Sequence, residues 1–309
     1  AYTWDRARHR QTGQISAMLA NGEPIDVFSI DAPLLDVNGN EVNKRDRLSY
    51  AILHQVSGEY RGEFGDLTTV LGLRAPFFKR ELNQNCFTTS AGGFVDCPAP
   101  GQDLSNYVDA SFNADHAAPQ SRTYNYDKLL PNVGLTYEFA PSASVFASYA
   151  KNLSVPGTDA LYGSLFVGVS PVPETSDSFD LGLRYQTGSI QAQVTGWYNR
   201  YNNRLATAYD PIQDRSITRN LGKVEKYGVD GSIAWAPSEP FLFYVFGSYL
   251  KSEIDEDIQT GEDTFAATAG KREAGAPKFT VGARAQGALG PVELGAQIKR
   301  TGSRFLNDI

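Results

Sequence analysis

The sequence predicts an all-β fold, a transmembrane antiparallel up-and-down β-barrel, and three observations support this. Apolar and polar residues alternate with a period of two over long segments, short and long connections alternate between them, and the 309 residues include 29 Gly, 16 Tyr and 17 Phe. A period of two puts the apolar side chains of a strand on one face and the polar ones on the other. A membrane-spanning helix is excluded, because no segment approaches the about 18 consecutive apolar residues that it needs.

The segment 173–205 carries the clearest pattern. From Phe179 the apolar residues Phe179, Leu181, Leu183 and Tyr185 alternate with polar residues, and a second alternating run begins at Ile190 after the turn Thr187-Gly188-Ser189. Two such runs around a tight turn predict an antiparallel hairpin. The second arm continues to about Tyr201, close to the ~9–11 tilted residues with which a β-strand crosses a bilayer.

The other expected strands follow the same rule in chain order. In the first strand, Tyr2 and Trp4 are followed by arginines at every second position, on the same face. The strand 241–254 is apolar on both faces, so the sequence does not decide which face points outward. The strand 278–286 places Phe279 outward and Arg284 inward. The complete set of expected strands is 1–12, 46–60, 67–79, 130–139, 144–153, the two arms of the 173–205 hairpin, 224–236, 241–254, 278–286 and 292–305.

The connections between these strands alternate strictly in length. Short turns follow every second strand, as at 61–66 and 140–142, and long polar segments such as 13–45 and 206–222 lie between them. Outer-membrane barrels have short periplasmic turns and long extracellular loops. A soluble β-sandwich or propeller is the alternative, but it has no reason to collect its long connections at one end. About eleven strands with free edges predict an open fragment, roughly half of a larger barrel.

Charge and cysteine content limit the function. The net charge of −7 argues against a nucleic-acid partner. The two cysteines, Cys86 and Cys97, lie in a polar segment and are expected to form a loop disulfide in an oxidising compartment, with two unpaired thiols as the alternative. No metal site is expected, because neither cysteine has a further Cys or a His at ligand spacing. The three histidines have no partner spacing for a catalytic triad, so no enzyme activity is expected and no cofactor is implied.

Polar residues of the alternating strands form the first group of candidates. We expect a polar wall facing the barrel lumen, either guiding a ligand or serving as a generic hydrated surface, because a charge on the lipid face costs about 2–4 kcal/mol at the midplane. The members of this wall are Asp180, Arg184, Lys226, Asp230 and Arg284.

The long loops supply the second group, because cationic and aromatic side chains can bind a bulky anionic ligand. Loop packing or an interfacial aromatic belt is the alternative role. The candidates are Arg122, Tyr124, Tyr126, Tyr162 and Phe166. The acidic run 253–257 lacks the ordered alternation of a calcium loop and is expected to be a solvated face.

An ordered series of motifs resembles the C-terminal part of the barrel of TonB-dependent outer-membrane receptors. Each motif alone is weak, but they follow one another in family order over most of residues 67–308. They are LGLRAPFFKRELNQNC at 71–86, LLPNVGLTYEFAPSASVFASYAKNL at 129–153, PETSDSFDLGLRY at 173–185, GWYNRYNNRL at 196–205, NLGKVEKYGVDGSIAWAP at 220–237, GAPKFTVGARA at 275–285 and TGSRFLND at 301–308.

The resemblance implies a barrel of about 22 strands with a plugged lumen. It also implies import of a scarce, large ligand, most often a ferric siderophore, driven through the TonB system acting on the plug, with outer-membrane lipid around the barrel. Residues 1–309 would then be a partial barrel domain without the plug domain, the TonB box and the final strands. A passive porin would share the strand pattern but need no plug.

Overall fold

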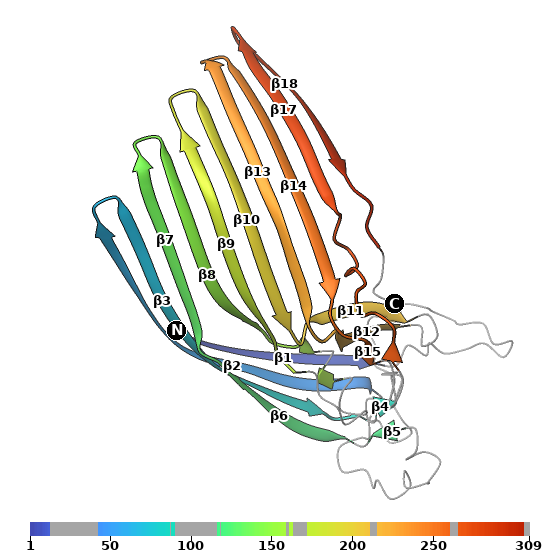
Figure 1. Cartoon of the computed structure of the whole chain (residues 1–309). Helices are drawn as coiled ribbons and strands as arrows, with labels where there is room; N and C mark the ends of the chain where they lie inside the picture. Colours follow the sequence, from blue (N-terminus) through green and yellow to red (C-terminus); the bar gives the residue numbers. More distant parts are fainter. Residues whose placement is uncertain are drawn as a thin grey trace, which may run out of the picture. The chain divides into compact units, whose positions relative to one another are not determined.

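The computed structural model describes residues 1–12, 43–86, 88–89, 116–117, 119–158, 161–162, 172–210, 215–259 and 265–305. In this part of the chain the strands form a 12-stranded sheet with the order β1-β2-β3-β7-β8-β9-β10-β13-β14-β17-β18, and β6 also pairs with β3 (Figure 1). Every pairing between neighbours whose register is known is antiparallel. The expected all-β, up-and-down antiparallel fold is therefore confirmed.

The strands of this sheet are long. They are β1 (Tyr2–Thr12), β2 (Asn43–Phe64), β3 (Leu67–Gln84), β6 (Gln120–Asp127), β7 (Leu130–Ala140), β8 (Ala143–Ser154), β9 (Glu174–Gln186), β10 (Ile190–Asn202), β13 (Val224–Ser238), β14 (Phe241–Ile254), β17 (Phe279–Leu289) and β18 (Val292–Thr301). Short two-stranded sheets pair β4 (Thr88–Thr89) with β5 (His116–Ala117), β11 (Leu205–Asp210) with β12 (Arg215–Asn220), and β15 (Ile258–Gln259) with β16 (Phe265–Ala266). No helix in the described ranges is long and apolar enough to cross a membrane.

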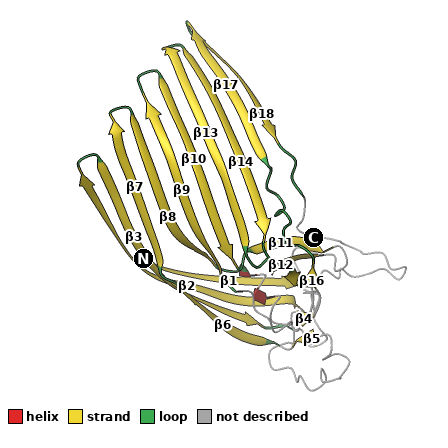
Figure 2. Ribbon diagram, viewed as in Figure 1, coloured by secondary structure: helices red, strands yellow, loops and turns green. Residues whose placement is uncertain are grey.

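The chain divides into two compact units. Unit 1 comprises residues 1–55, 76–127 and 156–171, and unit 2 comprises residues 56–75, 128–155 and 172–309. In unit 2 the short connections 65–66, 141–142, 187–189, 239–240 and 290–291 gather at one end of the strands, which we call the turn end (Figures 1 and 2). The opposite end, where the long connections begin, is the loop end.

Strand register gives the sheet of unit 2 two chemically different faces. Across the strands, Ala147 pairs with Leu181, Leu181 with Gly196, and Gly196 with Val229, so these residues share one face. We call it the apolar face. Its large side chains are exposed, and Leu181 retains 61% of its accessible surface. The register also places Phe243, Val245 and Tyr249 of β14 on this face, which answers the question that the sequence left open for residues 241–254.

Aromatic residues border the apolar face at both ends. Tyr149 packs against Phe179 with ring centroids 4.9 Å apart, and Phe179 lies 6.3 Å from Tyr198 near the loop end. Near the turn end, Trp235 packs against Phe243 at 5.6 Å. Membrane barrels have an outward apolar band between two aromatic girdles, and this face has the same arrangement.

Glycines lie beneath large side chains on the polar face, opposite the apolar one. Phe146 is paired with Gly182, Trp197 with Gly228, and Phe246 with Gly282, each across a boundary between two hairpins. A Cβ at these glycines would come within 2.6 Å of the Phe146 ring, 2.7 Å of the Trp197 ring and 2.5 Å of the Phe246 ring. Any side chain larger than that of glycine at these positions would therefore collide with the ring on the neighbouring strand.

Unit 1 has a small core on the far part of β3. Leu82 packs with Leu161 and Tyr162 from the segment between β8 and β9, and Tyr124 of β6 packs against this cluster. The bidentate pair from Arg8 Nη2 to Asp46, at 3.0 and 2.8 Å, joins β1 to β2.

Two details of the expected strand plan are wrong. The segment 61–66 was expected to be a turn, but β2 continues to Phe64 and only residues 65–66 turn, with Gly65 at φ 61°. The segments after β3 and after β10 were expected to be loops, but they contain β6 and the β11–β12 hairpin. The strand β6 carries polar residues on both faces, so no apolar alternation marks it.

Candidate functional site

The five charged residues of the expected polar wall share the face opposite the apolar one. Register pairs Asp180 with Trp197, Arg184 with Gln193, Lys226 with Asn199, Asp230 with Thr195, and Arg284 with Tyr244, all on this face. The five do not form one cluster. Ser148 donates a 2.9 Å hydrogen bond to Asp180 in the middle of the strands, and the Arg184 guanidinium lies 4.1 Å above the Phe146 ring, closer to the turn end.

Lys226 alone belongs to a compact ionic network at the loop end. Its ammonium pairs with Glu273, which lies in the connection between β14 and β17. The other oxygen of Glu273 accepts a 2.9 Å hydrogen bond from Arg204 Nε. Arg204 Nη1 donates to both oxygens of Glu174, at 3.1 and 2.9 Å. We call Glu174, Arg204, Lys226 and Glu273 the loop-end network; its formal charges, two positive and two negative, cancel.

Local structure fixes the positions of these groups. Glu174 opens β9 and also accepts a 2.8 Å hydrogen bond from the backbone of Leu205. Arg204 follows Asn203, which has a positive φ of 53°, and its backbone bonds with Leu221 and Gly222 close the base of the β11–β12 hairpin. The network therefore joins the ends of three connections: the one before β9, the one after β10 and the one before β17.

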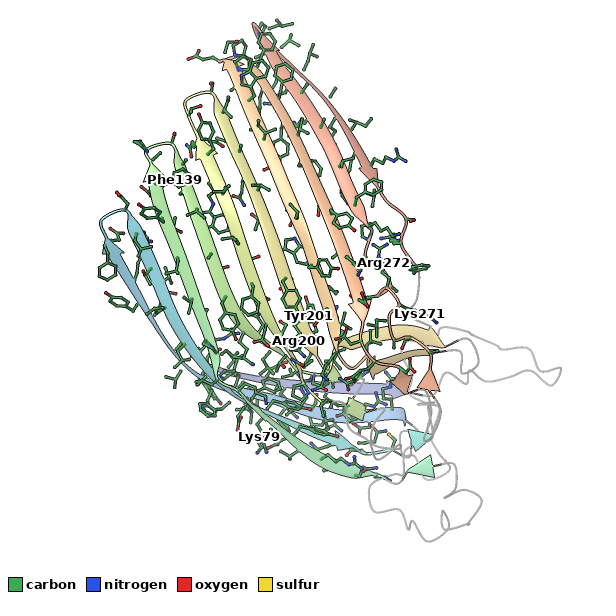
Figure 3. The ribbon with its side chains drawn as sticks, in the orientation of Figure 1. Lys79, Phe139, Arg200, Tyr201, Lys271 and Arg272 are labelled. Atoms are coloured by element: carbon green, nitrogen blue, oxygen red, sulfur yellow. The ribbon has the colours of Figure 1, made fainter. Side chains whose placement is uncertain are left out.

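A hydrophobic base supports the network. Tyr201 packs against the buried cluster of Leu221, Val224 and Ile254. Its ring faces both cations, with the Arg204 guanidinium 4.8 Å and the Lys226 ammonium 5.0 Å from the centroid. Figure 3 shows Tyr201 at the loop end of β10, together with Lys271 and Arg272 of the connection that carries Glu273.

Burial makes the charges of this network interdependent. The side chains of Glu273 and Glu174 keep only 6% and 9% of their accessible surface. Burial alone lowers the pKa of Arg204, but the hydrogen bonds and charges of Glu273 and Glu174 outweigh it and raise that pKa. Removing Glu273 would leave the partly buried Lys226 ammonium without this carboxylate, and removing either glutamate would leave Arg204 with one carboxylate in place of two. Loss of one partner of a buried ion pair is costly in a medium of low polarity.

The structure brings three of the five loop candidates together in unit 1. Tyr124 and Tyr126 of β6 stack with centroids 6.2 Å apart, and Tyr162 lies in the cluster against which Tyr124 packs. Arg122 lies on the same strand and pairs in register with Leu82. Phe166 lies outside the described residues.

Tyr162 is held from two sides. The Arg47 guanidinium lies 4.5 Å above its ring, and its hydroxyl donates a 3.3 Å hydrogen bond to the carbonyl of Asn83. Burial raises the pKa of the Tyr162 hydroxyl. Only 2% of Tyr162 is exposed, so its side chain anchors the loop on β3 in this conformation. Direct ligand contact by Tyr162 would require this segment to move.

Cys86 is buried and accepts a 2.9 Å hydrogen bond from the backbone N–H of Asp46. Cys97 lies outside the described residues, so the Cys86–Cys97 disulfide stays a prediction.

The acidic residues that follow β14 form contacts with nearby residues. Glu256 pairs with Lys223 at 3.1 Å, and Asp257 accepts a hydrogen bond from the backbone of Thr268. Within the described ranges, no three His, Cys, Asp or Glu side chains are grouped to hold a metal ion.

Sequence reasoning found Lys226 but missed Arg204, Glu174 and Glu273. The hydrogen-bonded pairs are 30 and 69 residues apart, and no spacing rule links them. One signal was available: Glu174 and Arg204 lie at the two ends of the alternating hairpin 173–205, and antiparallel pairing brings the ends of a hairpin together.

Known proteins match both the sequence and the fold. The family model described as "TonB dependent receptor-like, beta-barrel" matches residues 2–309. The rhizobactin receptor of Rhizobium meliloti (strain 1021) is 22% identical over 155 residues, which cover 42% of this chain and 19% of that protein.

Solved structures are similar at low sequence identity. The unliganded ferric citrate transporter FecA matches with a TM-score of 0.63 and 16% identity, over 87% of this chain and 35% of that one. The ferric yersiniabactin uptake receptor FyuA from Yersinia pestis matches with a TM-score of 0.58 and 14% identity, over 87% of this chain and 38% of that one. The chain thus spans between about a fifth and two fifths of the length of these proteins.

Proposed function

The chain belongs to the family of TonB-dependent receptors, whose β-barrel it matches, and we propose that it forms part of the wall of a receptor that imports a ferric siderophore. The family resides in the bacterial outer membrane and consists of transport receptors.

The two-faced sheet is the observation that carries this proposal. An exposed apolar face with aromatic borders suits contact with lipid, because an outward apolar band between aromatic girdles is the mark of an outer-membrane barrel. The opposite face carries Asp180, Arg184 and Lys226, and charged groups there avoid the cost of facing hydrocarbon. A sheet with these faces separates lipid from a polar interior.

The loop end supports a large anionic ligand. In unit 2 the long connections begin there, and the Arg204 guanidinium lies over the Tyr201 ring. Unit 1, taken by itself, has a pair of the same kind, Arg47 over Tyr162. Guanidinium groups bind carboxylates through paired, charge-assisted hydrogen bonds, and aromatic faces add stacking surface. The printed names of relatives point to ferric chelates, namely ferric citrate and ferric yersiniabactin.

Energy coupling completes the proposal. The whole protein would contain a plug within the barrel, and the TonB system would act on that plug to release the ligand into the periplasm. Membership of the TonB-dependent receptor family supports the TonB system as a partner. A passive porin is the competing function, and it would need neither the plug nor TonB.

The test is iron uptake by cells that depend on this receptor. The gene is deleted in its own bacterium, and radioactive iron supplied as a set of ferric siderophores is followed into cells grown without free iron. Loss of uptake for one siderophore, restored by the gene but not in a strain without TonB, is the expected result. Unchanged uptake of every siderophore would refute siderophore import, and restored uptake without TonB would favour the porin.

A further inference from the structure

Glu273 occupies a position that a carboxylate from outside could also occupy. One of its oxygens accepts from Arg204 Nε at 2.9 Å and the other pairs with the Lys226 ammonium. A single carboxylate thus bridges two cations on the polar face, near the Tyr201 ring. The geometry of a two-cation carboxylate site is therefore already built, and a residue of the chain fills it.

Arg204, one of the two cations of this site, has further contacts that hold it in place without Glu273. Glu174 receives two hydrogen bonds from Arg204 Nη1, and Tyr201 lies against the guanidinium. Departure of Glu273 would leave Arg204 oriented, with its Nε–H available. It would also change the formal charge of the loop-end network from zero to plus one, which favours an incoming anion.

The backbone around Glu273 contains two glycines and is held by three hydrogen bonds: Gly270 N–H donates to Ile254 at 2.8 Å, the Lys271 carbonyl accepts from Ile254 at 2.8 Å, and Gly275 N–H donates to Phe305 at 2.9 Å. Gly270 and Gly275 flank Glu273, with positive φ values of 76° and 77°, and a Cβ at either position would meet no atom within 4 Å. Glycine is permissive in this region of φ and ψ, so these residues can change conformation at little steric cost. Release of the segment 270–275 therefore requires these hydrogen bonds to break, and the two glycines then allow its backbone to change conformation without a steric clash.

We propose that Arg204 and Lys226 form a binding site for a ligand carboxylate, and that Glu273 acts as an internal latch which occupies this site until an anionic ligand displaces it. Displacement releases the segment 270–275 from the polar face. The ligand class rests on the proposed import of a ferric chelate, but exchange at the site is a property of these residues and can be measured without transport. No covalent bond is made or broken, because one carboxylate replaces another in the same ion pairs.

Two neighbouring residues provide a direct readout of the latch. Lys271 and Arg272 are trypsin sites adjacent to Glu273, and Figure 3 labels both at the loop end. Proteolysis requires the local segment to open, so cleavage there reports how often the latch is released. The probe is iron(III)–citrate, a carboxylate-rich chelate, added to the full-length protein in outer-membrane vesicles.

The central variant is Glu273→Gln, which removes the charge and keeps the size. It should be cut at 271–272 without probe at least about tenfold faster than the wild type, and it should bind iron(III)–citrate about tenfold more tightly, a normal size for such coupling. In the wild type, the probe should accelerate cleavage. The matched control is Glu256→Gln, in the same connection but in an exposed pair with Lys223, and it should behave like the wild type.

The double variant Glu273→Gln/Lys226→Met separates loop release from anion binding. Its segment should still be cut rapidly, but the network has lost its surplus charge and one cation, so the tighter binding should disappear. The heat-modifiable gel shift of a folded barrel verifies folding of each variant.

Either of two outcomes would overturn the latch. One is cleavage of Glu273→Gln at the wild-type rate. The other is faster cleavage with no tighter probe binding, which would make Glu273 only a loop anchor. Failure of siderophore import in cells would instead refute the proposed function, and the vesicle assays would not register it.

Discussion

Replacing Gly182 with alanine tests whether the aromatic rings on the polar face need glycine beneath them. The new Cβ would lie 2.6 Å from Cε1 of Phe146 and 2.7 Å from the backbone oxygen of Val194. Ordinary carbon contacts begin near about 3.5 Å. The ring can move away, but the carbonyl oxygen belongs to the β9–β10 pairing and cannot move without disturbing it.

The expected cost follows from these two contacts. Overpacking of this kind costs about 1–3 kcal/mol, and the smaller chain entropy of alanine in the unfolded state returns about 0.4–1 kcal/mol. Taking the middle of both ranges, we expect Gly182→Ala to lower the free energy of unfolding by about 1.3 kcal/mol. Displacement of Phe146 also disturbs the Arg184 guanidinium, which lies 4.1 Å above that ring.

The assay is urea unfolding of the barrel in lipid vesicles. The matched control is Gly134→Ala, because Gly134 pairs with Ser148 and its Cβ would come no closer than 3.7 Å to Val70. In a Phe146→Ala background the cost of Gly182→Ala should fall by about 0.5–1 kcal/mol, the coupling expected for residues in contact. Equal effects at Gly182 and Gly134, or no coupling with Phe146, would refute the reasoning.

Three further predictions concern the faces, the loops and the cysteines. Leu181→Arg on the apolar face should cost about 2–4 kcal/mol and reduce the amount of assembled barrel in outer membranes. By contrast, Gln193→Glu places a charge on the polar face opposite Arg184 and should not destabilise the protein; equal assembly of the two would contradict the assignment of faces. Burial, and then the nearby carboxylates, raise the pKa of Asp255, so its ionised form disfavours the folded state. Asp255→Asn should therefore stabilise the protein at neutral pH, and the advantage should shrink as the pH falls through the raised pKa; urea midpoints at several pH values measure this, and a constant difference would be the contrary result. Intact mass after alkylation without reductant should show no modified thiol at Cys86 or Cys97, and two modified thiols would disprove the disulfide.

Most strands of the sheet could be predicted from the sequence, because the two faces of each strand contact different environments and this difference produces the period-two pattern. The expected range 241–254 agrees with β14 residue for residue, and 130–139 agrees with β7 to within one residue. The pattern could not give the facing of β14, because both of its faces carry apolar residues and only the pairing with its neighbours β13 and β17 decides between them. It also failed for β6, where tyrosine and arginine alternate with polar residues.

The loop-end network could not be predicted from the sequence, for a different reason. Lys226 could be assigned to the polar face from its parity alone, but its partner Glu273 comes from a connection without periodicity. Side-chain pairs between loops depend on how the loops fold back, and no local rule determines this. The glycine positions below Phe146, Trp197 and Phe246 likewise depend on strand register, which a single strand does not contain.

The most direct test of the account is the lipid exposure of successive residues along β9. Single cysteines are placed at positions 179–184 of the full-length protein and labelled with a fluorophore, and quenching by lipids with brominated chains is compared with quenching by a water-soluble reagent. The account predicts that lipid quenching alternates, strong at 179, 181 and 183 and weak at 180, 182 and 184, because Leu181 lies on the apolar face and Asp180 on the polar face. Uniform quenching along the strand, or lipid quenching strongest at the polar positions, would contradict a membrane wall with these two faces.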